Sequence, residues 1–180
     1  MQVEIVFAGF GGQGVLLAGK VLAEVGMKMG KEVVWLPSYG PEMRGGTANC
    51  TVIISDEPIA SPIISHPRDI VVMNRPSLEK FSRAQRPGGM AIVNTSLINI
   101  RPERNDIRVV EVPANEIAIA AGTGRAANMV MLGAYVGATD IVPIDAVFEQ
   151  VKEEFEKRPK LVPVNVKCIE EGYKIGKQVG

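Results

Sequence analysis

The chain has 180 residues, and its 20 lysine and arginine residues equal its 20 aspartate and glutamate residues. This length lets one domain bury about 70% of the surface of the unfolded chain, and the charge balance argues against nucleic acid or an anionic membrane as a partner. The two cysteines form no C-x-x-C pair, which argues against a self-contained iron–sulfur or zinc-ribbon site. With no apolar run near the ~20 residues of a membrane span and no signal-peptide layout, we expect one cytoplasmic domain over residues 1–180.

The first predicted element is a buried strand at residues 3–7, which are mostly apolar. The sequence GFGGQGV follows at residues 9–15, and apolar residues then recur at helical spacing from Val15 to Met29. Strand, glycine turn and helix is the order in which a G-x-G-x-x-G pattern has meaning. Glycine allows a sharp turn, and the free N–H groups at a helix N-terminus favour anions. We therefore predict that this turn binds an anion. The residues predicted to form the site are Gly9, Gly11, Gly12, Gln13 and Gly14.

The second predicted strand, residues 32–36, tests whether this turn belongs to a nicotinamide site. Such a site places Asp or Glu at the end of the second strand, ~20 residues on, to bind the ribose. This strand instead ends in PSYG, and Glu32 stands at its beginning. The residues of the two strands therefore support the α/β fold but argue against NAD(P) as its ligand. An NAD(P) enzyme and a glycine turn that only packs helix on strand both stay open as alternatives.

The loop at residues 38–46 is dense in turn formers. In a doubly wound sheet it lies at the carboxyl edge, beside the first glycine turn. Arg44 is suited to bidentate pairing with a phosphate or carboxylate, Glu42 to orienting that arginine, and Gly45 and Gly46 to close approach by another backbone. The alternative is a solvated surface loop.

The remaining sequence alternates strands with helices, which predicts an α/β fold with a doubly wound, mostly parallel sheet and helices on both faces (Rossmann-like). The helix predicted at residues 126–138 is rich in small residues and is expected to pack closely against a neighbour. The other predicted strands are 47–55, 69–74, 90–94 and 107–112, and the other helices are 77–84, 113–121, 144–155 and 165–178.

Catalytic residues are hard to find in this chain. His66 is the only histidine, and its loop position favours a surface role. No serine lies in G-x-S-x-G, and the glycine loop lacks the Lys-Ser/Thr ending of a P-loop. We therefore expect that the isolated chain folds but catalyses nothing. Asn128, which follows the sequence GTGR at residues 122–125, is a further candidate at a helix start near an anion site.

Four blocks of the sequence, in order, resemble one family. Residues 9–15 resemble the G-x-G-G-Q-G-V signature of the gamma subunit, or gamma domain, of 2-oxoacid:ferredoxin oxidoreductases, and residues 38–46 resemble its second signature. Residues 59–62 and 128–134 resemble its later blocks. The form of the second signature is more similar to that of the 2-oxoglutarate and branched-chain 2-oxoacid enzymes than to that of the pyruvate or indolepyruvate branches. The binding residues implied in that signature are Tyr39, Glu42, Arg44, Gly45 and Gly46.

The resemblance implies a complex that oxidatively decarboxylates a 2-oxoacid with coenzyme A, gives acyl-CoA and CO2, and reduces ferredoxin. It places thiamine diphosphate, magnesium and iron–sulfur clusters on alpha, beta and delta-type partner subunits, and it gives this chain a part in the coenzyme A side of the site. A free-standing NAD(P) oxidoreductase and a scaffold that binds no ligand remain the alternatives. Neither the identity of the 2-oxoacid nor the stoichiometry follows from the sequence.

Overall fold

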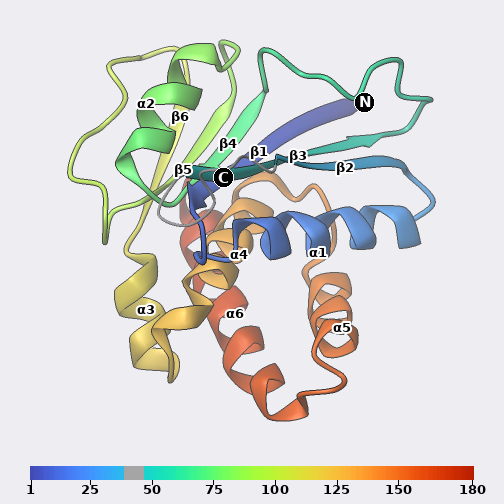
Figure 1. Cartoon of the computed structure of the whole chain (residues 1–180), viewed down its shortest axis with the longest axis vertical. Helices are drawn as coiled ribbons and strands as arrows, with labels where there is room; N and C mark the ends of the chain where they lie inside the picture. The colour runs from blue at the N-terminus through green and yellow to red at the C-terminus, as the bar shows by residue number, and fades with distance from the viewer. Residues whose placement is uncertain (39–46) are drawn as a thin grey trace.

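A computed structural model describes residues 1–38 and 47–180, and its strands form one mixed sheet (Figure 1). The predicted strands are confirmed, although the fourth ends two residues early because Asn74 caps the helix that follows it. The strands are β1 (Gln2–Phe10), β2 (Glu32–Ser38), β3 (Thr47–Ser55), β4 (Asp69–Val72), β5 (Met90–Asn94) and β6 (Arg108–Val112).

Each predicted helix is also present. The last one begins three residues earlier than predicted, and Pro163 lies in its first turn, where a missing N–H group is tolerated. No helix in the described parts of the chain is long and apolar enough to span a bilayer. The helices are α1 (Val15–Lys28), α2 (Arg75–Ala84), α3 (Ala114–Ala121), α4 (Ala127–Thr139), α5 (Ile144–Glu154) and α6 (Val162–Val179), with short 3-10 turns η1 (Gly124–Ala126) and η2 (Pro159–Leu161).

The strand order is β2-β3-β1-β4-β5-β6, and the neighbouring pairs from β1 to β6 are parallel. β3 is antiparallel to both β1 and β2 and lies between them, so the first two strands are not neighbours, as a simple βαβ unit would have made them. In the two registers Phe10 lies opposite Thr47, and Ser38 lies opposite Asn49. Ser38 and Thr47, which flank residues 39–46, therefore lie at the edge of the sheet where β1 ends. The predicted residues within that segment lie outside the described residues.

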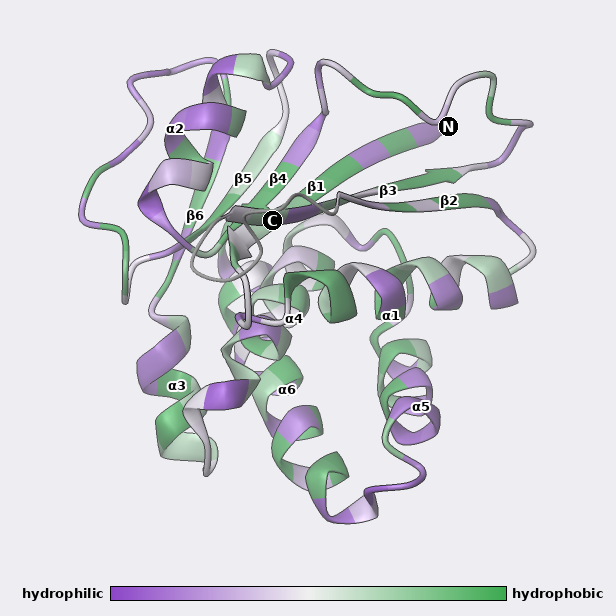
Figure 2. Ribbon diagram, viewed as in Figure 1, coloured by the Kyte–Doolittle hydropathy of each residue, from purple (hydrophilic) through white to green (hydrophobic). Residues whose placement is uncertain are grey.

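The helices cover the two faces of the sheet unequally (Figure 1). α2 packs on one face against Val6, Ile70 and their neighbours, whereas the larger core on the other face includes residues of α1 and of α3 to α6. In Figure 2 much of α2 is purple, whereas β1 is mostly green. Helices on both faces are therefore confirmed.

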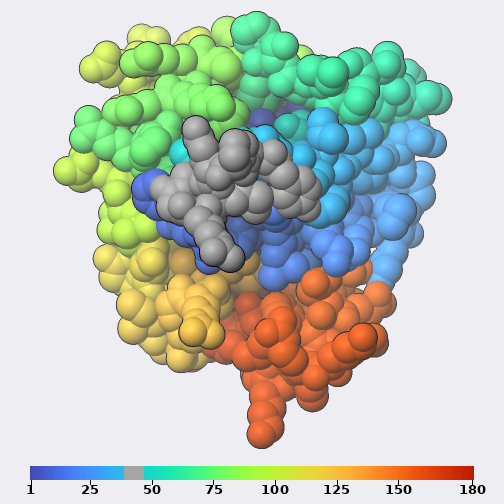
Figure 3. Space-filling model, in the orientation of Figure 1, coloured from blue at the N-terminus to red at the C-terminus, as the bar shows by residue number. Residues whose placement is uncertain are grey.

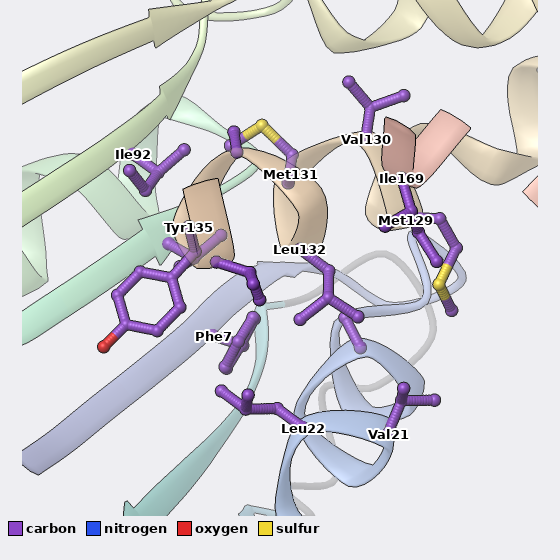
Figure 4. Packing of buried hydrophobic residues seen from close by; sticks show 14 of the residues in the cluster. Phe7, Val21, Leu22, Ile92, Met129, Val130, Met131, Leu132, Tyr135 and Ile169 are labelled. Atoms are coloured by element: carbon purple, nitrogen blue, oxygen red, sulfur yellow. The ribbon is translucent and has the colours of Figure 1, made fainter. Parts of the chain in front are cut away.

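α4 is the centre of the larger core. All of its residues except Thr139 are buried, which is the pattern of a helix enclosed on every side. In Figure 4 its side chains lie between Ile92 and Phe7 of the sheet and Leu22 of α1. The rings of Phe7 and Tyr135 meet edge to face, with centroids 6.3 Å apart.

The crossing of α4 with α6 depends on glycine. A Cβ atom added to Gly133 would lie within 3.0 Å of the carbonyl oxygen of Ile169, and one added to Gly172 would lie within 3.0 Å of the carbonyl oxygen of Val130. Gly137 and Gly176 make equally close approaches to the opposite helix. The close packing predicted for the small-residue helix is thus confirmed, with backbone against backbone.

A buried polar pair joins the sheet to α4 at the edge opposite the glycine turn. The Tyr135 hydroxyl donates to Asp69 Oδ2 at 2.8 Å, and Met90 N donates to Asp69 Oδ1 at 2.8 Å. Burial raises the pKa of the Tyr135 hydroxyl well above its ordinary value, and the Asp69 carboxylate raises it further. Burial also raises the pKa of Asp69, although its two hydrogen bonds oppose that rise.

We expect Tyr135→Phe to lower the free energy of unfolding by about 2 kcal/mol, because a buried carboxylate oxygen then loses its donor. Urea denaturation measures this. Tyr173→Phe is the matched control: Tyr173 is half-buried and its hydroxyl meets the exposed Lys177 ammonium rather than a buried group, so we expect a change within about 0.5 kcal/mol. Equal effects of the two substitutions would contradict a stabilising role for the Asp69–Tyr135 pair.

Candidate functional site

The glycine turn between β1 and α1 is closed by two hydrogen bonds. Phe10 N donates to Gln13 Oε1 at 2.6 Å, and Gln13 N donates to Phe10 O at 3.1 Å. Gly12 and Gly14 have φ values of 90° and 73°, in the left-handed region where glycine is favoured. The oxygen of Gln13 therefore holds the turn itself, and only its NH2 group remains for a ligand.

The glycines of the turn have different roles. A Cβ at Gly9 would lie 2.6 Å from Gln13 Oε1 and 2.8 Å from Met73 Cβ, so Gly9 allows the turn to pack. Gly12 is exposed, and a Cβ there would meet nothing within 4 Å. Gly11 is half-buried between them. Gly12 is therefore the position at which a ligand has open access to the backbone.

Three backbone amides of the turn have no hydrogen-bond acceptor among the described residues. Within the described parts of the chain, the amides of Gly11, Gly12 and Gly14 donate to no acceptor. The first turn of α1 contains no acidic residue that would neutralise the positive end of the helix dipole. These amides and the N-terminus of α1 together provide the donor set that binds phosphate or carboxylate in other proteins.

Asn128 contacts this turn across a long stretch of sequence. Its side chain is 5% exposed, and its Nδ2 donates to the carbonyl oxygen of Gly14 at 3.0 Å. Asn128 is the second residue of α4 and so lies at a helix start, as predicted, but it is not the N-cap, because that residue is Ala126, which makes no side-chain cap. The amide is used instead to hold Gly14 in place, so it positions the turn.

Two clefts open on either side of the turn. The larger, about 390 Å³, lies between the start of α1, η1 and the region around η2. The smaller, about 210 Å³, lies between the turn, Met73 and the start of α3. Gly12 and Arg125 line both clefts. In Figure 3 the blue N-terminal surface lies directly above the yellow surface near α3 and the orange surface near α5.

The clefts combine cationic and apolar groups. Arg125 is exposed, and Arg158 stacks over the Phe155 ring with its guanidinium carbon 5.7 Å from the centroid. Phe155 and Leu17 line the larger cleft, whereas Asn115 lines the smaller one and accepts a 2.8 Å hydrogen bond from Asn94 Nδ2. The larger cleft can therefore contact an anion and an apolar ring at the same time.

Arg125 and Arg158 were not among the predicted site residues. The only sequence signal for Arg125 is its place in the GTGR stretch before Asn128, and Arg158 follows an apolar stripe with no motif of its own. Both lie more than 100 residues after the glycine turn, and the fold brings them to it. An isolated arginine has no periodicity that would mark it as part of a site.

The groups that could support catalysis lie elsewhere or are buried. His66 is exposed, and its Nδ1 lies 3.0 Å from the carbonyl oxygen of Ala84. Burial raises the pKa of the Cys50 thiol to about 12 and that of Cys168 to about 11. Thiols with such pKa values are poor nucleophiles and poor cluster ligands. Across residues 1–38 and 47–180, no group of three metal-ligating side chains comes together.

Comparison with known sequences identifies the family. The family described as pyruvate ferredoxin/flavodoxin oxidoreductase matches residues 4–175. Among curated proteins, the chain is 40% identical over 173 residues to the ketoisovalerate oxidoreductase subunit VorA of Methanothermobacter marburgensis, which covers 95% of this chain and 36% of VorA. The chain thus spans about a third of the length of the first curated relatives that it matches.

Comparison with solved structures gives the same fold. The keto/oxoacid ferredoxin oxidoreductase gamma subunit from Geobacter sulfurreducens superposes with a TM-score of 0.88 at 30% identity, covering 99% of this chain and 98% of that chain. The 2-oxoglutarate:ferredoxin oxidoreductase from Magnetococcus marinus, solved with 2-oxoglutarate, coenzyme A and succinyl-CoA bound, superposes with a TM-score of 0.89. That match has 21% identity and covers 99% of this chain and 32% of that chain, so it shows the shared fold alone.

Proposed function

The chain belongs to the pyruvate ferredoxin/flavodoxin oxidoreductase family, and from this membership we propose that it is the gamma-type part of a 2-oxoacid:ferredoxin oxidoreductase. Such a complex oxidatively decarboxylates a 2-oxoacid with coenzyme A, releases acyl-CoA and CO2, and passes the electrons to ferredoxin. In this proposal thiamine diphosphate, magnesium and iron–sulfur clusters are carried by alpha, beta and delta-type partners. The similarity to VorA favours a branched-chain 2-oxoacid as the substrate class.

The role proposed for this chain is to bind coenzyme A and present it to the catalytic subunits. The observation that carries this role is the pair of clefts that meet at Gly12 and share Arg125. The amides of Gly11, Gly12 and Gly14, which have no acceptor in residues 1–38 and 47–180, and the Arg125 guanidinium suit the phosphates, since charge-assisted hydrogen bonds to phosphate are the strong ones. Phe155 and Leu17 offer an apolar surface of the kind that an adenine ring contacts.

The same residues argue for binding rather than catalysis. The thiols of Cys50 and Cys168 are buried, and no histidine lines either cleft. The missing ribose acid at the end of β2 weighs against NAD(P) as the ligand. The isolated chain is therefore expected to bind coenzyme A and to catalyse no 2-oxoacid-dependent electron transfer.

Segment 39–46 is proposed to complete this side of the site. The residues that flank it support this, because Thr47 pairs with Phe10 at the end of β1 and Ser38 pairs with Asn49. Tyr39 and Arg44 within it are residue types favoured at interface cores. In this proposal the segment contacts both coenzyme A and the catalytic subunits.

We expect Arg125→Ala to weaken the affinity for coenzyme A about tenfold, because a phosphate then loses a charge-assisted partner. Calorimetric titration of the chain with coenzyme A measures this, and Arg44→Ala is tested in the same way. Lys157→Ala is the control, since Lys157 is exposed, lies near the larger cleft and does not line it. Titration with NADH provides the comparison ligand.

Three results would contradict the proposed role. Coenzyme A could fail to bind, Arg125→Ala and Lys157→Ala could change its affinity equally, or NADH could bind more tightly than coenzyme A. The last result would favour the alternative of a free-standing NAD(P) enzyme. Reduction of ferredoxin or a viologen by the pure chain with a 2-oxoacid would separately overturn the assignment of catalysis to partner subunits.

A further inference from the structure

Charge is unevenly distributed along this neutral chain. Residues 64–108 contain eight lysine and arginine residues against four acidic ones, whereas the rest of the chain has an acidic excess of the same size. One of those four acids, Asp69, is buried. The segment includes α2 and the connection from β5 to β6, which lie on the face of the sheet away from α1 and α4 (Figure 1). Arg68 and Arg108 instead line a cleft beside Tyr135 of α4. α2 and the connection themselves contain five lysine and arginine residues against three acidic ones, so this part of the surface has a modest positive excess.

A groove of about 380 Å³ lies between α2 and the β5–β6 connection. Four arginines line it, two from α2 and two from the connection, and Glu79 and Glu103 also line it. Its apolar lining comes from Leu78, which is buried, and Ile100, which is half-buried. The four arginines are Arg75, Arg83, Arg101 and Arg104.

Arg104 is held in a fixed orientation. Its Nη1 donates to the carbonyl oxygens of Ser82 at 2.7 Å and Gln85 at 2.6 Å, at the end of α2. Its Nε and Nη2 donate to the two carboxylate oxygens of Asp106 at 2.7 and 2.6 Å. Only about a fifth of the Arg104 side chain is exposed (21%). It therefore fixes the groove wall by joining the connection to α2.

The other arginines are available to a partner. Arg75 pairs with Glu79 at 2.9 Å, and Arg101 pairs with Glu111 at 2.9 Å. Both partners of each pair are exposed, and exposed ion pairs contribute little to stability. Arg83 forms no ion pair with any residue in 1–38 or 47–180. Arg83 thus has least to lose on binding a new carboxylate, and Arg101 is the most exposed of the three paired arginines, at 68%.

We propose that this groove docks an acidic segment of a partner protein, with carboxylates paired to Arg83 and Arg101 and an apolar side chain on Leu78 and Ile100. The mixed lining favours a polypeptide over nucleic acid. Glu79 and Glu103 would repel the continuous charge of a phosphate backbone, whereas a peptide can place its acidic residues away from them. This surface is separate from the clefts at the glycine turn, so it adds a contact beyond the proposed coenzyme A site.

The test uses the full chain and a fluorescent peptide in which pairs of glutamates alternate with single leucines. Fluorescence anisotropy should show binding that weakens as salt rises from about 50 to 200 mM. Arg83→Glu combined with Arg101→Glu should weaken it about tenfold or more, because attraction becomes repulsion at two positions. Lys152→Glu combined with Lys167→Glu changes the net charge equally on exposed positions of α5 and α6, and it should change the affinity less than about twofold.

A length-matched oligothymidylate tests the competing explanation, that the groove binds nucleic acid. Tighter binding of the oligothymidylate than of the peptide would overturn the proposal in favour of a nucleic-acid surface. Failure of the peptide to bind, or equal losses in the two double variants, would also overturn it. Circular dichroism of both double variants establishes that neither result arises from unfolding.

Discussion

Replacing Gly172 with alanine should lower the free energy of unfolding by about 3 kcal/mol or more, close to the limit for overpacking a core. The added Cβ would lie within 3.0 Å of the Val130 carbonyl oxygen and 2.9 Å from the Ala134 amide nitrogen. Both are backbone atoms of α4 and cannot rotate away, so the helices would have to separate along a buried crossing. Urea denaturation gives the loss directly.

Gly124→Ala is the matched control for that experiment. A Cβ at Gly124 would lie 3.4 Å from the side chain of Ile119, an ordinary contact, and its backbone is not in the left-handed region. We expect a change within about 0.5 kcal/mol, since surface substitutions of this kind have small effects. A loss at Gly172 no larger than at Gly124 would show that the two helices have room to adjust.

Replacing Gly14 with alanine should destabilise the protein by about 2–3 kcal/mol and also weaken coenzyme A binding. Two causes act together: a φ of 73° strains any residue with a Cβ, and that Cβ would lie 2.9 Å from Asn128 Cγ and closer still to its amide nitrogen. Asn128→Ala alone should cost about 1 kcal/mol, the usual contribution of one hydrogen bond.

A double-mutant cycle separates the two causes. In the Gly14→Ala/Asn128→Ala protein the contacts shorter than 3.0 Å are gone, and what remains is the backbone strain, the lost hydrogen bond and a 3.3 Å approach to the Cβ of residue 128. Its destabilisation should therefore be smaller than the sum of the single losses, because contacting residues are not additive. Strict additivity in urea denaturation would mean that Asn128 moves aside without cost and does not clamp the turn.

Sequence periodicity predicts most of the elements and the direction in which their side chains face. Alternation along β3 predicts that Cys50 and Val52 face the helices, and both belong to the larger core. The small residues of α4 predict a close helix contact, which α6 supplies. Such patterns report burial, so they succeed wherever burial decides the conformation.

Strand order and site assembly could not be predicted in this way. The alternation of apolar and polar residues along β3 predicts which of its sides is buried, but it does not predict which strands lie beside it. The position of β3 between β1 and β2 therefore cannot be read from the residues of β3. The contact between Asn128 and Gly14 spans 114 residues, and Arg125 reaches the glycine turn only through the packing of α4. The roles of Tyr39, Glu42, Arg44, Gly45 and Gly46 stay predictions.

The glycine crossing of α4 and α6 also has a consequence for biosynthesis. A ribosome makes α6 after every other element of this fold, yet α6 supplies Gly172 and Gly176, half of the glycines at the crossing. Until α6 emerges from the exit tunnel, the apolar surface of α4 that it covers has no partner, and nascent chains with such exposed surface are prone to aggregate. Completion of the core therefore waits for the synthesis of α6, and the surface of α4 that α6 covers is the last part of this core to be buried.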